Sequence, residues 1–266
     1  MIAGPDLAPR IASAIVLGTV AVLAAWWGGI AMAVLVTLAA AIVHLEWTGI
    51  TEGSQPAAIA FTGCVAVTVF VAGIGHIEVA AIVGCLLAVI AVVAGPRPWR
   101  PAGVVYASAF GLSLLALRDS ADGLAAIGFL FAVVWGTDIG AYFAGRAIGG
   151  PKLWPAVSPK KTWSGAIGGL CTAVVAGLAV AWGVGVPVGL ALVVVALVLS
   201  IAGQFGDLFE SFVKRHFGVK DSGSIIPGHG GLMDRVDALI FAGVVAVLTG
   251  MIHSGGTDAA RGLIRW

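Results

Sequence analysis

Charged side chains are scarce in this 266-residue chain, since Asp, Glu, Lys and Arg together make up only 10% of it. Hydrophobic residues make up 60%, and the mean hydropathy is +1.07. That composition excludes a soluble globular protein of this length. A helix needs about 20 apolar residues to cross a bilayer, and residues 11–43 contain no charged side chain. The sequence therefore predicts an integral membrane protein.

Cysteine is also scarce, and its positions imply neither a disulfide framework nor a zinc site. Cys64, Cys85 and Cys171 lie in apolar runs at unrelated spacings, where small packing residues are expected. No repeat, second domain or low-complexity tail is visible. We therefore expect one membrane domain over residues 1–266, with N-terminal helices in 1–130 and the chemistry in 131–266. The net charge of +1 gives no reason to expect a nucleic-acid partner.

The apolar runs predict an all-α, polytopic fold, because they are too long for strands and do not alternate. About nine transmembrane helices are expected, at residues 11–27, 30–48, 57–75, 78–95, 101–118, 122–144, 163–183, 187–212 and 236–253.

The basic residues predict the orientation, because Lys and Arg concentrate in cytoplasmic loops. Nine spans with the loop after the eighth inside place the N-terminus in the cytoplasm and the C-terminus outside. Of the 14 bases, three (Arg118, Arg261 and Arg265) then lie outside and eleven inside. We therefore expect a polar catalytic site that opens to the cytoplasmic side of a bacterial-type inner membrane.

The charges that the chain does contain gather between residues 206 and 237. Asp207, Glu210, Ser211 and Lys214 would share one face of a helix, since they are spaced i, i+3, i+4 and i+7. A loop with Gly and Pro follows, IIPGHGG, and then Asp234-Arg235-Val236-Asp237. Two carboxylate clusters with bases among them suit a divalent cation and a polyphosphate.

This stretch resembles the signature of the phosphatidate cytidylyltransferase (CDP-diacylglycerol synthase) family over residues 211–237. The matching positions are Ser211, Lys214, Arg215, Lys220, Asp221, Gly223, Pro227, His229, Gly230, Gly231, Asp234, Arg235 and Asp237. A looser likeness runs from Trp135 to the C-terminus and includes Ser158-Pro159-Lys160-Lys161-Thr162. Ser164 departs from the pattern, because many relatives carry Glu there, and we assign it no role.

The resemblance implies transfer of the cytidylyl group of CTP to phosphatidate, which gives CDP-diacylglycerol and pyrophosphate. Mg²⁺ is the expected cofactor, since carboxylates and hydroxyls suit a hard cation. The expected ligands are Asp207 and Asp234, supplemented by Ser211 or Asp237, and then Asp221 and Asp138. The expected catalytic residues are Asp207, Lys214, Arg215, Lys220, Asp221, His229, Asp234 and Arg235. The expected substrate-binding residues are Lys160, Lys161, Thr162, Ser211, Lys214, Arg215, Lys220, His229 and Arg235. His229 is expected either to donate to pyrophosphate or to brace its loop.

Ionisable residues in or beside the other spans carry further expectations. Asp138 lies well inside an apolar run, which is typical of a functional carboxylate or of one paired with a base. Trp47 is expected at the lipid headgroups, with His44 and Glu46 reaching water, or else lining the polar cavity. Arg97 and Arg100 are expected to face anionic lipid.

Two other classes of protein remain as alternatives. A CDP-alcohol phosphatidyltransferase is also a Mg²⁺-dependent membrane enzyme, but the motif spacing typical of that family is missing here. A transporter is less favoured, because transporters usually contain internal repeats with interrupted helices. The family resemblance also suggests a homodimer.

Overall fold

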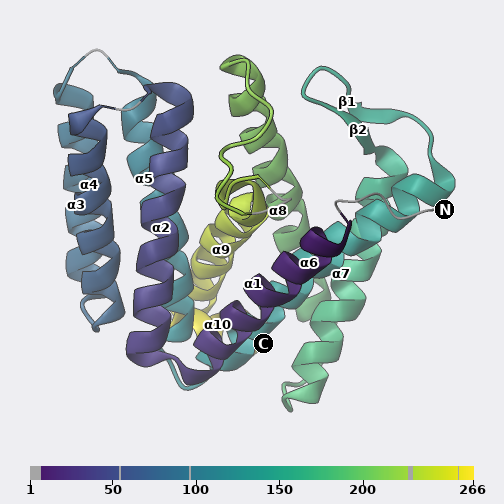
Figure 1. Ribbon diagram of the computed structural model, residues 1–266. Helices are drawn as coiled ribbons and strands as arrows, with labels where there is room; N and C mark the ends of the chain where they lie inside the picture. The colour runs from purple at the N-terminus through teal and green to yellow at the C-terminus, as the bar shows by residue number, and fades with distance from the viewer. Residues whose placement is uncertain (1–6, 54, 96, 227–229, 257) are drawn as a thin grey trace. The chain divides into compact units, whose positions relative to one another are not determined.

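The computed structural model describes residues 7–53, 55–95, 97–226, 230–256 and 258–266 (Figure 1). Its elements in chain order are α1 (Leu7–Trp27), α2 (Gly29–Thr51), α3 (Pro56–Gly73), α4 (Ile77–Val93), α5 (Trp99–Arg118), α6 (Gly123–Ile148), β1 (Lys152–Trp154), β2 (Ser158–Thr162), α7 (Trp163–Gly183), α8 (Leu190–His216), α9 (Met233–Ser254) and α10 (Ala259–Ile264). The chain forms two compact units. Unit 1 contains residues 1–115 and 216–236, and unit 2 contains residues 116–215 and 237–266.

The predicted all-α membrane class is confirmed. Each predicted span overlaps one of the helices α1 to α9. Within the described ranges, seven of these helices are long and apolar enough to cross a membrane, and α4 and the Ala12–Trp27 part of α1 are shorter apolar helices. The number of spans, their orientation and the single-domain organisation stay predictions. The short helix α10 and the β1–β2 hairpin were not predicted.

In unit 1, α2 packs against α3 and α3 packs against α4 (Figure 1). The expectation that His44, Glu46 and Trp47 reach headgroups or water is wrong, because all three are buried inside this unit. His44 Nδ1 lies 2.7 Å from Thr62 Oγ1, and Trp47 Nε1 donates to the carbonyl of Trp99 at 2.9 Å. Neighbouring helices thus supply the polar partners that water would have supplied.

The expectation that Arg100 faces lipid is also wrong. Its side chain is 5% exposed, and its Nη2 lies 2.7 Å from Oε2 of Glu52, whose side chain is 1% exposed. Arg97 lies farther from the same carboxylate, at 3.9 Å, and stays 39% exposed. This pair joins the end of α2 to the start of α5, because burying either charge alone would be costly.

In unit 2, α6 and α7 lie side by side and are joined by the β1–β2 hairpin (Figure 1). Their glycines allow a close approach of the two backbones. A Cβ atom at Gly140 would lie 2.0 Å from Thr172 Oγ1, and one at Gly168 would lie 2.2 Å from Ala144 Cβ. Small residues at such contacts replace the hydrophobic driving force that is absent between helices in lipid.

The C-terminal segment closes unit 2 through α10, which packs against α6. Arg265 Nη2 donates to Oδ1 of Asp122 at 2.8 Å. This hydrogen bond and the charge of Asp122 raise the pKa of the Arg265 guanidinium. The pair is exposed and is therefore expected to contribute little to stability.

Candidate active site

The predicted polar face of α8 is present in unit 2. Glu210 is 1% exposed, and its Oε2 lies 2.6 Å from Nζ of Lys214, one helical turn later. Ser211 Oγ donates to Oδ1 of Asp207 at 3.4 Å. Arg215, four residues after Ser211, is exposed. The spacing i, i+3, i+4 and i+7 therefore placed the polar residues correctly on one helix.

The β1–β2 hairpin brings a second predicted segment to this face. Antiparallel pairing of Lys152 with Thr162 and of Trp154 with Ser158 forms the hairpin. Lys161 forms an ion pair with Oδ2 of Asp207, although 46 positions separate the two residues, and both side chains are about one-third exposed. Lys160 is exposed. An ammonium group thus holds the carboxylate that was predicted as the leading metal ligand.

Thr162 has a structural contact that the sequence did not predict. Its hydroxyl accepts the backbone N–H of Gly165 at 3.1 Å, so Thr162 is the N-cap of α7. Ser164 donates to the carbonyl of Gly149 and lies 3.0 Å from the Thr162 hydroxyl. These bonds fix the hairpin to the start of α7. The predicted role of Thr162 in substrate binding stays a prediction.

Helices α8 and α9 cross closely beside Asp207. A Cβ atom at Gly206 would lie 2.5 Å from the carbonyl oxygen of Asp237, so only glycine fits there. The Asp237 side chain is buried. It interacts electrostatically with three other carboxylates of this unit, those of Asp138, Asp207 and Glu210. Asp138 itself is exposed on α6.

These carboxylates fit Mg²⁺ in kind, but two of them, Asp207 and Glu210, are paired with lysines in this structure. Like charges that interact in a medium of low dielectric repel one another unless cations lie among them. Lys161 and Lys214 supply two such cations. Among the residues that the structure describes, no three Asp, Glu, His or Cys side chains are grouped closely enough to hold a metal ion.

The signature loop, residues 217–232 between α8 and α9, lies in unit 1. Oδ2 of Asp234 accepts the backbone N–H groups of Ser222 at 3.0 Å and Gly231 at 2.9 Å. The backbones of Ile226 and Gly230 form a bridge. Gly230 has a φ of +84°, and a Cβ atom there would lie 2.8 Å from Asp234 Oδ2. Asp234 therefore folds the loop around its own carboxylate.

The other predicted site residues of this segment lie in the loop or at the start of α9. Lys220, Asp221 and Arg235 are exposed in unit 1. His229 and Pro227 lie outside the described residues. Sequence analysis missed the link between Glu46 and this loop. The available signal was a carboxylate in an otherwise apolar helix, which is costly unless it has partners.

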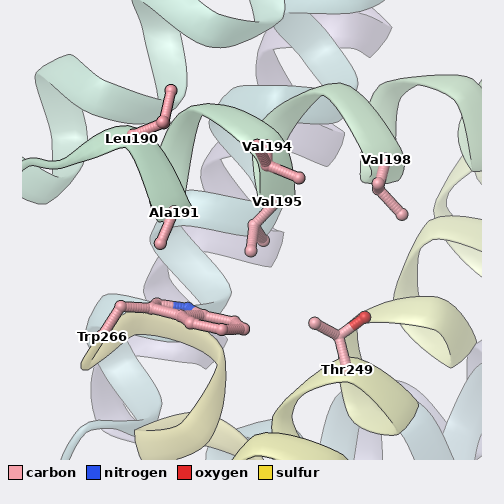
Figure 2. Close-up of a pocket in the computed structure, with 7 residues that line it drawn as sticks. All are labelled: Leu190, Ala191, Val194, Val195, Val198, Thr249 and Trp266. Atoms are coloured by element: carbon pink, nitrogen blue, oxygen red, sulfur yellow. The ribbon is translucent and has the colours of Figure 1, made fainter.

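An apolar cavity of about 410 Å³ lies in unit 2. Figure 2 shows its lining by one side of α8, Thr249 of α9 and the ring of Trp266. Its only side-chain polar atoms are the Thr249 hydroxyl and the Trp266 indole nitrogen. Val198, the lining residue of α8 nearest to Asp207, precedes it by nine residues, or about 13 Å along a helix. The cavity is therefore separate from the charged face and lacks the groups that bind phosphate.

Comparison with known proteins identifies the family. The sequence profile of the cytidylyltransferase family matches residues 8–253. The phosphatidate cytidylyltransferases of Brucella suis and Brucella abortus are each 45% identical over 258 residues, which cover 94% of this chain and 95% of theirs. That of Staphylococcus haemolyticus is 51% identical over 121 residues, 45% of this chain and 46% of its own. The chain therefore belongs to the cytidylyltransferase family and is a nucleotidyltransferase built as an integral membrane protein.

Proposed function

We propose that this protein is a phosphatidate cytidylyltransferase, which converts CTP and phosphatidate to CDP-diacylglycerol and pyrophosphate. The observation that carries the proposal is the ion pair of Lys161 with Asp207. It joins a predicted phosphate-binding segment to a predicted cation-binding helix face. The phosphatidate cytidylyltransferases that match over nearly the whole chain support the same substrates.

In this reaction an oxygen of the phosphatidate phosphate attacks the α-phosphorus of CTP. The new P–O bond forms as the bond from the α-phosphorus to the β-phosphate oxygen breaks, and pyrophosphate leaves. A phosphomonoester is largely ionised near neutral pH because its second pKa is about 6. No strong protein base is then required. The main task of the protein is to bring two anions together, and Lys161 and Lys214 are suited to hold phosphate oxygens.

Mg²⁺ is proposed as the cofactor, because the acids of unit 2 offer only oxygen donors and repel one another. Asp207 would hold it, with Asp237 and the hydroxyl of Ser211 as further donors. When bound, Mg²⁺ supplies charge neutralisation for the departing pyrophosphate. Lys161 leaves Asp207 for the phosphates as the substrates bind. Asp234, Asp221 and Asp138 remain predicted ligands, and Lys220, Arg215 and Arg235 predicted phosphate contacts.

The proposed location is a bacterial-type inner membrane, with the N-terminus and the active site on the cytoplasmic side. The eleven-to-three division of the bases supports this orientation. CTP is a cytoplasmic metabolite, so the site has to open to that side. A homodimer is part of the proposal only through the family resemblance.

The test is an assay of purified protein with radiolabelled CTP, phosphatidate in detergent micelles and Mg²⁺. We expect labelled CDP-diacylglycerol and one pyrophosphate released for each product molecule. A matched reaction supplies CDP-diacylglycerol and an alcohol instead of CTP and phosphatidate. Release of CMP there, without product from CTP, would contradict the proposal and favour a CDP-alcohol phosphatidyltransferase.

A further inference from the structure

Glu46, near the C-terminal end of α2, is bonded to the signature loop although about 180 positions separate them. Its Oε1 accepts the backbone N–H of Leu232 at 2.9 Å, and its Oε2 accepts that of Met233 at 2.7 Å. Oε2 also accepts the hydroxyl of Ser222 at 3.2 Å. All four residues belong to unit 1. One carboxylate from another helix thus joins Ser222, in the first half of the loop, to the end of the loop where α9 begins.

The bonds to Leu232 and Met233 lie where a helix most needs partners. Helix α9 begins at Met233, and the first N–H groups of a helix have no acceptor within that helix. A carboxylate at this end is also favoured by the helix dipole. Glu46 is 8% exposed. Its burial without a basic partner among these contacts is explained by three hydrogen-bond donors that converge on it.

Two glycines of the loop leave room for this carboxylate. A Cβ atom at Gly223 would lie 2.8 Å from Glu46 Oε1, and the next two nearest atoms also belong to Glu46. A Cβ atom at Gly231 would lie 2.6 Å from Glu46 Oε2. Gly223 has no positive φ. The close approach of Glu46, and not the backbone conformation, is therefore what requires glycine at residue 223.

We propose that Glu46 is a positioning residue for nucleotide binding. It holds the loop in the shape that presents Lys220 and Arg235 to the CTP phosphates. Asp234 holds the same loop from within, through Ser222 and Gly231. The nucleotide part of this inference rests on the proposed function, whereas the holding of the loop rests on the contacts alone.

The kinetic test uses Glu46→Gln, which has one acceptor and places an NH₂ group against backbone N–H donors. We expect the KM for CTP to rise at least tenfold, while the KM for phosphatidate changes less than threefold. Glu52→Gln is the matched control, because Glu52 is the C-cap of the same helix and its side chain, 1% exposed, pairs with Arg100 and not with the loop. It should lower thermal stability without raising the KM for CTP. An unchanged KM in Glu46→Gln, or an equal rise in Glu52→Gln, would overturn the proposal.

A second test does not depend on catalysis. Hydrogen–deuterium exchange of the Leu232 and Met233 amides should accelerate at least tenfold in Glu46→Gln and less than twofold in Glu52→Gln. Equal exchange in wild type and Glu46→Gln would refute the holding of the loop. If the exchange accelerates but wild-type protein makes no CDP-diacylglycerol, the proposed function fails and the contact stands.

Gly223→Ala approaches the same contact from the loop and leaves Glu46 in place, so it tests the proposal even if Glu46→Gln does not fold. Gly223→Ala keeps every hydrogen-bonding group, and its methyl group would meet only Glu46 among its nearest atoms. We expect it to accelerate exchange of the Leu232 and Met233 amides in wild type and to add less than twofold in the Glu46→Ala background. Equal effects in the two backgrounds would show that Gly223 acts independently of Glu46 and would overturn this part of the proposal.

Discussion

The carboxylates that hold the signature loop in unit 1 and those on the face of α8 in unit 2 have different partners. Around the signature loop, Glu46 of α2 and Asp234 of α9 accept backbone N–H groups, which are part of the main chain and cannot leave. On the face of α8, Asp207 and Glu210 are paired with the ammonium groups of Lys161 and Lys214. A lysine side chain has a flexible stem and can turn toward another anion.

The difference in partners indicates that the carboxylates of the two units serve different purposes. A carboxylate bonded to backbone amides fixes the shape of a loop, and its loss exposes several unpaired donors at once. A carboxylate paired with lysine can exchange that partner for a metal ion, while the lysine turns to a phosphate. We infer that unit 1 contributes a fixed loop and that unit 2 contributes the exchangeable charges.

The largest effect is expected from Asp207→Asn. This change removes the charge that pairs with Lys161 and that is proposed to hold Mg²⁺, so turnover should fall to nearly nothing. Helix α8 should stay folded, because Asp207 is about one-third exposed and its ion pair with Lys161 is partly open to solvent. Initial rates measure turnover, and thermal unfolding of the purified protein measures whether the fold persists. Asp119→Asn, at an exposed acid outside the site, is the control and should retain full activity. Normal turnover in Asp207→Asn would remove it from the reaction.

Two substitutions of Asp234 distinguish a metal ligand from a residue that only holds the signature loop. Asn can turn its side-chain oxygen toward Ser222 and Gly231 and keep both hydrogen bonds in neutral form, so Asp234→Asn should fold and should lose less stability than Asp234→Ala. Asp234→Ala loses both bonds and should be less stable by about 3 kcal/mol or more, at about 1.5–3 kcal/mol for each bond to a charged group.

Turnover then distinguishes the two roles in Asp234→Asn. If Asp234 is a metal ligand as the sequence predicts, this variant should lose nearly all activity although it remains folded. A stable and fully active variant would leave Asp234 as a brace alone, like Glu46.

A smaller effect is expected from Lys214→Arg. Surface attraction and membrane topology need only the positive charge, which Arg keeps. A phosphate contact depends on reach and donor geometry, and losing one charge-assisted hydrogen bond costs about 1.5–3 kcal/mol. We therefore expect kcat/KM for CTP to fall at least tenfold. Lys152→Arg, at an exposed lysine of the hairpin, is the comparison and should change kcat/KM less than twofold. Wild-type kinetics for Lys214→Arg would contradict the phosphate contact and would leave Lys214 only as one of the bases that set the membrane orientation.

Periodicity and composition predicted the helices and the polar face of α8, because both are local properties of the chain. They could not predict the pairing of Lys161 with Asp207, since that pair depends on a hairpin between two packed helices. They also assigned Glu46 to the membrane surface, because its partners are backbone amides, which any sequence contains. Gly223 reads as a turn residue in the sequence, yet it has no positive φ and instead makes room for Glu46.

The central claim is that Lys161 occupies a cation site on Asp207, and Mn²⁺ binding to the purified protein tests it most directly. Mn²⁺ takes the same oxygen ligands as Mg²⁺ and is visible by electron paramagnetic resonance. The account predicts that Lys161→Met binds Mn²⁺ more tightly than wild type, that Asp207→Asn binds it at least tenfold more weakly, and that Glu46→Gln binds it within twofold of wild type. Weaker binding in Lys161→Met, or unchanged binding in Asp207→Asn, would contradict it.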